Sequence, residues 1–161
     1  MQTTIRIGIA DMNYCDAPNL ITTLGLGSCV GVVLYDSAIK KCGMVHIMLP
    51  DSTIIQNNSN VAKFADTGIQ ALYDGFINRG ASKARIQAKI AGGAQMFAFG
   101  SSNSMMRVGE NNIRAVKEKL QQLRIPLVAE DTGLNHGRTI VFDPETSLLK
   151  VKIVGMNEKV I

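Results

Sequence analysis

Apolar and polar residues follow two periods along this chain, and each period predicts a different kind of element. Runs that alternate or stay continuously apolar are typical of strands. They fall at residues 5–9, 20–24, 30–35, 43–49, 86–90, 127–129, 139–142 and 148–154. Pro50 ends the fourth run, because proline cannot donate the next ladder hydrogen bond. Residues 143–147 (DPETS) carry the strongest turn signal and predict a hairpin between the last two runs.

Two other segments place apolar residues at spacings of three and four, which is typical of amphipathic helices. The first runs from Val61 to Phe76, with polar N-cap candidates at residues 58–60 and Gly80 as the closing glycine. The second is centred on residues 113–123 and is followed by a proline. Polar stretches between these elements predict a turn-rich segment that follows residue 9 and runs through residues 16–19, and a loop at residues 51–60.

Together these elements predict one α/β domain over residues 1–161. We expect a sandwich with a mixed, largely antiparallel β-sheet core and two main helices, because several of the strands are joined by hairpins. A doubly wound parallel sheet would need more crossover helices than the pattern offers.

Composition narrows the classes of function. No apolar run approaches the ~20 residues that cross a bilayer, and the first residues show no secretory signal. Three cysteines, an odd count, then favour a cytoplasmic protein with free thiols. The net charge of +4 comes from scattered bases, and aromatic residues make up only 5% of the chain, so a nucleic-acid surface is not predicted.

Neither a cofactor nor a metal is predicted from the motifs. No Cys-x-x-Cys pair or His/Cys cluster has the spacing of zinc ligands. Gly25-Leu26-Gly27 lacks the third glycine and the following helix that a dinucleotide site needs.

Cys29 and His46 are the clearest candidates for chemistry. If the hairpin between the strands at 30–35 and 43–49 turns midway between Ser37 and Lys40, His46 lies opposite Gly31. Cys29 is then its diagonal neighbour on the same face, at a Cα separation of about 7–8 Å that side chains can bridge. A register shifted by one residue would send His46 to the other face.

Two interpretations of this pair stay open from the residues alone. In the first, Cys29 is a nucleophile with His46 as its base, which a free thiol needs because little of it is ionised near neutral pH. Backbone N–H groups around Gly27 and Ser28 then form an oxyanion hole, since glycine lets a carbonyl approach the main chain. In the second, Cys29 is a small apolar residue and His46 a hydrogen-bonded core histidine.

The other cysteines and the second histidine are weaker candidates. Cys15 falls in the turn-rich segment and Cys42 at the hairpin loop, and we expect both to be surface or packing thiols. We expect His136 to be a loop residue, or a residue at the rim of the same pocket.

Five segments, taken in order, carry a resemblance that covers nearly the whole chain. They are residues 23–30 (TLGLGSCV), 44–50 (MVHIMLP), 63–67 (KFADT), 88–97 (AKIAGGAQMF) and 129–133 (AEDTG). In these segments the chain resembles the CheD family of bacterial and archaeal chemoreceptor glutamine deamidases. Two positions depart from the family pattern: Asn111 stands where an arginine is common, and Leu134 where a second glycine often follows Gly133.

The resemblance implies a cofactor-free enzyme with Cys29 as nucleophile, His46 as general base and then acid, and Thr23 helping to position His46. The implied reaction attacks a receptor glutamine, expels ammonia, passes through a thioester and leaves a glutamate. The substrate would be the cytoplasmic helices of methyl-accepting chemoreceptors, and the phosphatase CheC a regulatory partner. The fold would resemble that of bacterial toxin deamidases.

Two alternative functions stay open at this point. The domain could be a non-catalytic module that regulates receptors and CheC by binding them. It could also be a related cysteine hydrolase that cleaves receptor methyl esters as well as amides, since both reactions pass through a thioester.

Overall fold

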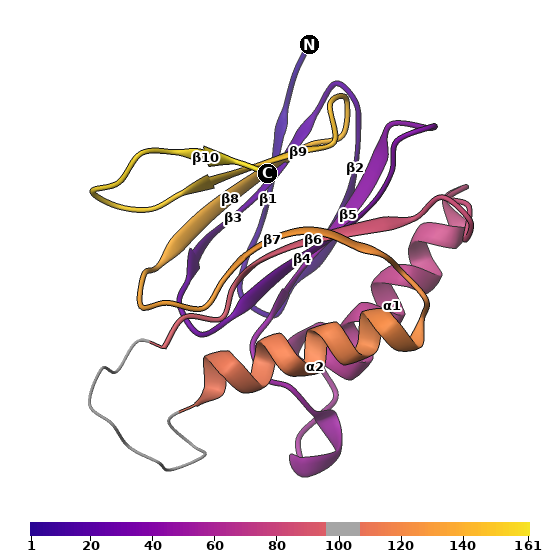
Figure 1. Ribbon diagram of the computed structural model, residues 1–161. Helices are drawn as coiled ribbons and strands as arrows, with labels where there is room; N and C mark the ends of the chain where they lie inside the picture. The colour runs from indigo at the N-terminus through magenta and orange to yellow at the C-terminus, as the bar shows by residue number, and fades with distance from the viewer. Residues whose placement is uncertain (96–106) are drawn as a thin grey trace.

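Two five-stranded sheets lie face to face, and two helices cover the outer face of one of them (Figure 1). The structure is a computed structural model that describes residues 1–95 and 107–161. Sheet A has the order β1 (Thr4–Ile7), β3 (Leu20–Leu26), β8 (Arg138–Asp143), β9 (Leu148–Lys152) and β10 (Lys159–Val160). Sheet B has the order β2 (Met12–Asp16), β5 (Lys41–Ile47), β4 (Val30–Asp36), β6 (Gln87–Gly92) and β7 (Leu127–Thr132).

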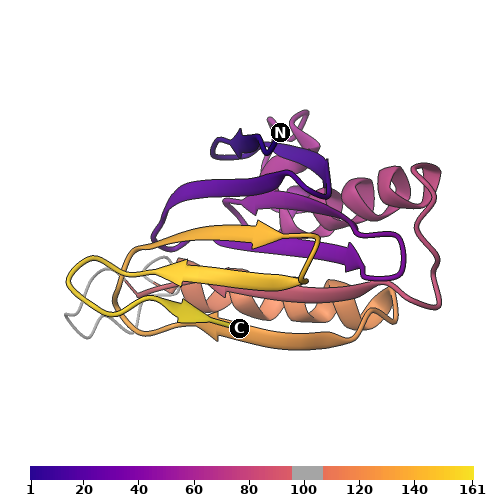
Figure 2. The same ribbon diagram turned by 90° about the horizontal axis from the view of Figure 1, so that it is seen from above.

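The helices α1 (Ala65–Asn78) and α2 (Val108–Gln122) pack on sheet B. Seen from above, sheet A lies over sheet B and the helices lie beneath (Figure 2). Neither helix of the described residues is long and apolar enough to span a membrane. Met96 and Phe97, which end one of the resembling segments, lie outside the described residues.

The predicted α/β sandwich with two main helices is confirmed, but the prediction of one core sheet is wrong. The strands divide between two sheets, each mainly antiparallel with one parallel pair, β1 with β3 and β6 with β7. The reason lies in β4, whose seven residues are all buried. Val32 and Leu34 face the helices, whereas Val33 and Tyr35 face sheet A. A strand that is apolar on both faces must be covered on both, and a second sheet supplies the second cover.

The first helix begins later than its apolar spacing predicts. Val61–Lys63 forms a short 3-10 helix that Asn60 caps through its side chain, and α1 starts only at Ala65. Phe64 between them is extended, because its backbone bridges to Leu49 and its ring is fully buried. Gly80, at φ +102°, ends the helix as predicted.

Two strands were not predicted, and one of them places the other cysteines. In β2, which falls in the segment interpreted as turn-rich, Cys15 lies directly opposite Cys42 of β5. Both thiols are free and buried between the sheets, so they pack, as predicted, but neither is a surface thiol. Cys42 lies within β5 and not in the hairpin loop. The other strand, β10, is only two residues long and exposed, so no apolar pattern marks it.

Candidate active site

The β4–β5 hairpin has the register that the sequence predicts. Gly31 pairs with His46 and Val30 with Ile47, and Cys29 is the residue immediately before β4. His46 and Cys29 are therefore diagonal neighbours at the end of the ladder, on the face that meets sheet A. Gly31 lets sheet A pack closely on this face, since a Cβ there would come within 2.6 Å of the Cδ1 of Ile140.

Thr23 of sheet A reaches His46 of sheet B across the space between the sheets. Its hydroxyl oxygen lies 2.8 Å from Nδ1 of His46, and the same hydroxyl donates to the carbonyl of Ile7 at 3.0 Å. That carbonyl can only accept, so the hydroxyl hydrogen goes to it and Thr23 accepts from an Nδ1–H. This tautomer leaves the lone pair of His46 Nε2 unprotonated, which is the state a general base needs.

Burial keeps both members of the pair uncharged near neutral pH. His46 is fully buried, and the loss of solvation holds the pKa of its imidazole below the ordinary 6.5. Cys29 is partly buried, and desolvation raises the pKa of its thiol above 9.0, although its own backbone N–H partly offsets this. No described residue bonds to His46 Nε2. The resting site is therefore a neutral thiol beside a neutral imidazole, and a base must take the proton when the sulfur attacks.

The titration of Cys29 tests this charge state. We expect its alkylation by iodoacetamide to accelerate with pH through a midpoint above 9, because only the thiolate reacts. Peptide mass spectrometry separates Cys29 from the buried Cys15 and Cys42. A thiolate already formed at pH 7, seen as a rate that stays flat from pH 7 upward, would contradict a neutral resting pair.

Three consecutive carbonyl groups hold the loop that carries Cys29. Gly27 accepts from the N–H of Ala94 and Cys29 from the N–H of Gly93, both at 2.8 Å. Ser28 accepts from the side chain of Asn112 at 2.9 Å. A trans peptide directs its N–H opposite to its carbonyl, so these bonds also fix the directions of the Ser28 and Cys29 N–H groups. The predicted oxyanion hole of backbone N–H groups around Gly27 and Ser28 stays a prediction.

Glycine is required where β6 turns beside this loop. Gly92 has φ +111°, and a Cβ there would overlap the carbonyl oxygen of Cys29. The backbone of residues 92–94 can therefore lie directly against the Cys29 loop and bond to it. The small residues of the segment 88–97 thus support the site through the main chain.

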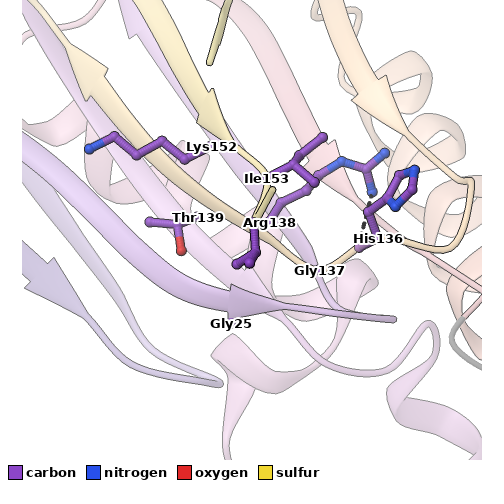
Figure 3. A pocket seen from close by; sticks show the side chains of 8 residues that line it. Gly25, His136, Gly137, Arg138, Thr139, Lys152 and Ile153 are labelled. Carbon is purple, nitrogen blue, oxygen red and sulfur yellow. Dashed lines mark hydrogen bonds between the residues drawn. The ribbon is translucent and has the colours of Figure 1, made fainter. Parts of the chain in front are cut away.

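A cavity of about 290 Å³ is lined by residues near the end of β3 and the start of β8 (Figure 3). Its lining includes Gly25, His136, Thr139 and Lys152, but neither Cys29 nor His46. His136 is a loop residue, as predicted, and belongs to this cavity. Arg138 also lines it, but its side chain is fully buried and bonds to Asp131 and nearby carbonyl oxygens, which fixes the loop.

Sequence reasoning missed Asn112, whose buried side chain contacts the Cys29 loop. Its signal was present, because Asn112, Val116 and Leu120 share one stripe of α2, and a polar residue in a buried stripe calls for a partner. Leu134, which departs from the family pattern, takes the left-handed φ of +58° that glycine adopts more readily, with its side chain exposed. Within residues 1–95 and 107–161, no cluster of three or more His, Cys, Asp or Glu side chains could hold a metal ion.

A cysteine beside a histidine that a hydroxyl group orients is the kind of site that nucleophilic hydrolases use. The family described as CheD chemotactic sensory transduction matches residues 48–153. Curated relatives match over nearly the full length of both chains. The chain therefore belongs to the CheD family.

Three relatives illustrate the similarity. The chain is 62% identical to the probable chemoreceptor glutamine deamidase CheD of Lachnoclostridium phytofermentans, over 99% of each chain. It is 50% identical to the chemoreceptor glutamine deamidase CheD of Halalkalibacterium halodurans, again over 99% of each. With the protein of that name from Bacillus subtilis it shares 46% identity, over 98% of this chain and 95% of the other.

Among solved structures, the fold is similar to that of the hypothetical protein YfiH of Bacillus licheniformis. The TM-score is 0.51 at 18% identity, and the match covers 77% of this chain and 51% of that one. At this identity the likeness concerns the fold alone. The predicted resemblance to bacterial toxin deamidases stays a prediction.

Proposed function

We propose that this chain is a chemoreceptor glutamine deamidase that works in the cytoplasm with Cys29 as nucleophile, His46 as general base and acid, and Thr23 as the residue that orients His46. The observation that carries the proposal is the 2.8 Å hydrogen bond between Thr23 and Nδ1 of His46, made across the two sheets. It leaves the Nε2 lone pair free, on the sheet face that His46 shares with Cys29. The names of the relatives supply the substrate, a glutamine of a chemoreceptor.

The reaction has two halves. In the first, the sulfur of Cys29 attacks the side-chain amide carbon of a glutamine while Nε2 of His46 takes the thiol proton. The N–H groups of Ser28 and Cys29 stabilise the oxyanion. The tetrahedral intermediate collapses to a thioester, and the C–N bond breaks as His46 returns the proton to the leaving nitrogen, which departs as ammonia.

In the second half, water replaces ammonia. Nε2 of His46 accepts a proton from a water molecule as its oxygen attacks the thioester carbon. The C–S bond then breaks, the sulfur regains its proton from His46, and the side chain leaves as glutamate. The groups of the enzyme end as they began, so no cofactor is consumed. Binding of the phosphatase CheC, which the family resemblance implies, stays a prediction.

Ammonia release tests the function. The purified chain is incubated with the purified cytoplasmic domain of a chemoreceptor, and ammonia is measured over time. We expect release with glutamine-bearing receptor and none with receptor whose methylation-region glutamines are replaced by glutamate. Binding of the receptor without any ammonia release would contradict the proposal and favour a non-catalytic module. Methanol release from methylated receptor would extend the activity to esters.

Replacing Thr23 by valine should lower kcat about 10–100-fold with little change in KM, because the shape is kept and only the group that orients His46 is lost. Thr23→Ser is the matched control: it keeps the hydroxyl and should retain most of the activity. Both variants are compared by ammonia release, with melting temperatures to show that they fold. A Thr23→Val protein with the kcat of the wild type would remove Thr23 from the mechanism.

A further inference from the structure

Asn112, on the first turns of α2, holds together the two segments that carry Cys29 and His46. In Figure 1, α2 lies along the helix-covered face of sheet B, near β4. Asn112 is fully buried there, and its Nδ2 donates to the carbonyl of Ser28 at 2.9 Å and to that of Met48 at 3.1 Å. Ser28 directly precedes Cys29, and Met48 lies two residues beyond His46.

The position is an unusual one for an amide. Asn112 lies in the same buried stripe of α2 as Val116 and Leu120, where an apolar residue would suit the packing. Its Oδ1 is buried and has no partner among the described residues. An acceptor left unpaired in the interior destabilises a protein, so each such group needs a physical reason. The two bonds that Nδ2 makes supply that reason.

The two hydrogen bonds of Asn112 lie just beyond the end of the β4–β5 ladder. The β4–β5 ladder ends at the pair Val30–Ile47, so neither Ser28 nor Met48 belongs to it. In the described part of the chain, Asn112 is the one side chain that hydrogen-bonds to both segments. Because it fixes the Ser28 carbonyl, it also directs the N–H of Cys29 away from α2.

The helix is held close enough for this short side chain to reach. A Cβ on Gly109, one turn earlier, would overlap the carbonyl oxygens of Gly93 and Ala94. Those residues are the ones whose N–H groups bond to Cys29 and Gly27. The start of α2, the turn after β6 and the Cys29 loop therefore form one tightly packed unit.

We propose that Asn112 is a positioning residue, which sets the spacing between Cys29 and His46 and aims the N–H of Cys29 at the reacting centre. The effect of Asn112 on the reaction rests on the proposed function. Its effect on Cys29 itself does not, and the two can be measured separately.

The test compares Asn112→Leu with Val116→Ala. Leucine has the same number and branching of side-chain heavy atoms as asparagine and is apolar like the rest of the stripe, but it cannot bond to Ser28 or Met48. Val116 is buried on the next turn of the same stripe, so its truncation loosens α2 without removing those bonds. A purely structural role for Asn112 predicts that both variants melt earlier and keep their kcat.

Two readouts are made below the melting temperatures of both variants. For Asn112→Leu we expect kcat for ammonia release to fall about 10–100-fold, since misplacing reacting groups by about 1 Å costs that order. We expect the pH midpoint of Cys29 alkylation to rise, because the Cys29 N–H that favours the thiolate is no longer held. For Val116→Ala we expect kcat within twofold of wild type and an unchanged midpoint.

The outcomes separate the two proposals. An unchanged midpoint in Asn112→Leu, or an equal change in Val116→Ala, overturns the role of Asn112. A kcat unchanged by Asn112→Leu in an active enzyme overturns it as well. Wild-type protein that releases no ammonia would contradict the deamidase function. If the pH midpoint of Cys29 alkylation still rises only in Asn112→Leu, the positioning of Cys29 by Asn112 is supported all the same.

Discussion

Replacing Cys29 by alanine should lower the rate of ammonia release on the order of 10⁵-fold or more, because the atom that forms the covalent intermediate is gone. The fold should survive. Cys29 lies outside the strands and is only partly buried, and its backbone carbonyl, which alanine keeps, makes the bond to Gly93 that holds the loop. Ammonia release measures the loss, and circular dichroism with thermal melting checks the fold.

Cys42→Ala is the matched control for this variant. Cys42 is fully buried between the sheets and faces Cys15, so its truncation should lower the melting temperature and leave kcat within a few-fold of wild type. The two variants should therefore differ: Cys29→Ala lowers turnover and keeps the fold, whereas Cys42→Ala lowers stability and keeps turnover. A Cys29→Ala protein that folds and turns over at the wild-type rate would exclude Cys29 as the nucleophile.

Replacing His46 by asparagine should lower kcat roughly 10²–10⁴-fold, the range that a general base contributes. The amide of asparagine can still donate to Thr23 near the place of Nδ1, but it offers no base in place of Nε2. The loss should persist at every pH, because asparagine has no titrating group that could take over the role of the base.

Alkylation of the same variant checks that any loss of turnover comes from the missing base and not from a damaged thiol. Cys29 in His46→Asn should still be alkylated by iodoacetamide at high pH, since the thiol itself is intact. If His46→Asn keeps its turnover, the interpretation of His46 as a core histidine is the correct one.

The pairing of Cys29 with His46 could be predicted from the sequence, because a hairpin with a short loop has few registers, and the one with its turn midway between Ser37 and Lys40 puts both on the same face as diagonal neighbours. Thr23 could not be found that way. It lies on another sheet, and its bond to His46 depends on how two sheets stack. Only the resemblance to the CheD family pointed to it.

Other features depended on tertiary contacts that local patterns do not carry. The apolar run of β4 predicted a buried strand, yet nothing in it says that a second sheet supplies the cover. Phe64 fits the helical stripe, but its backbone bridges to Leu49 and delays the helix. Asn112 falls among apolar positions of α2, and its carbonyl partners are distant in the sequence.

Peptide mass spectrometry of a receptor cytoplasmic domain, incubated with wild-type protein or with Cys29→Ala in water enriched in oxygen-18, measures the reaction itself. Hydrolysis of a thioester by solvent water places one heavy oxygen in each new glutamate, a mass gain of about three daltons in place of about one in ordinary water. We expect that gain at defined receptor glutamines, with wild type and not with Cys29→Ala. No gain with wild type, or the same gain with both proteins, would contradict a Cys29-dependent glutamine deamidase.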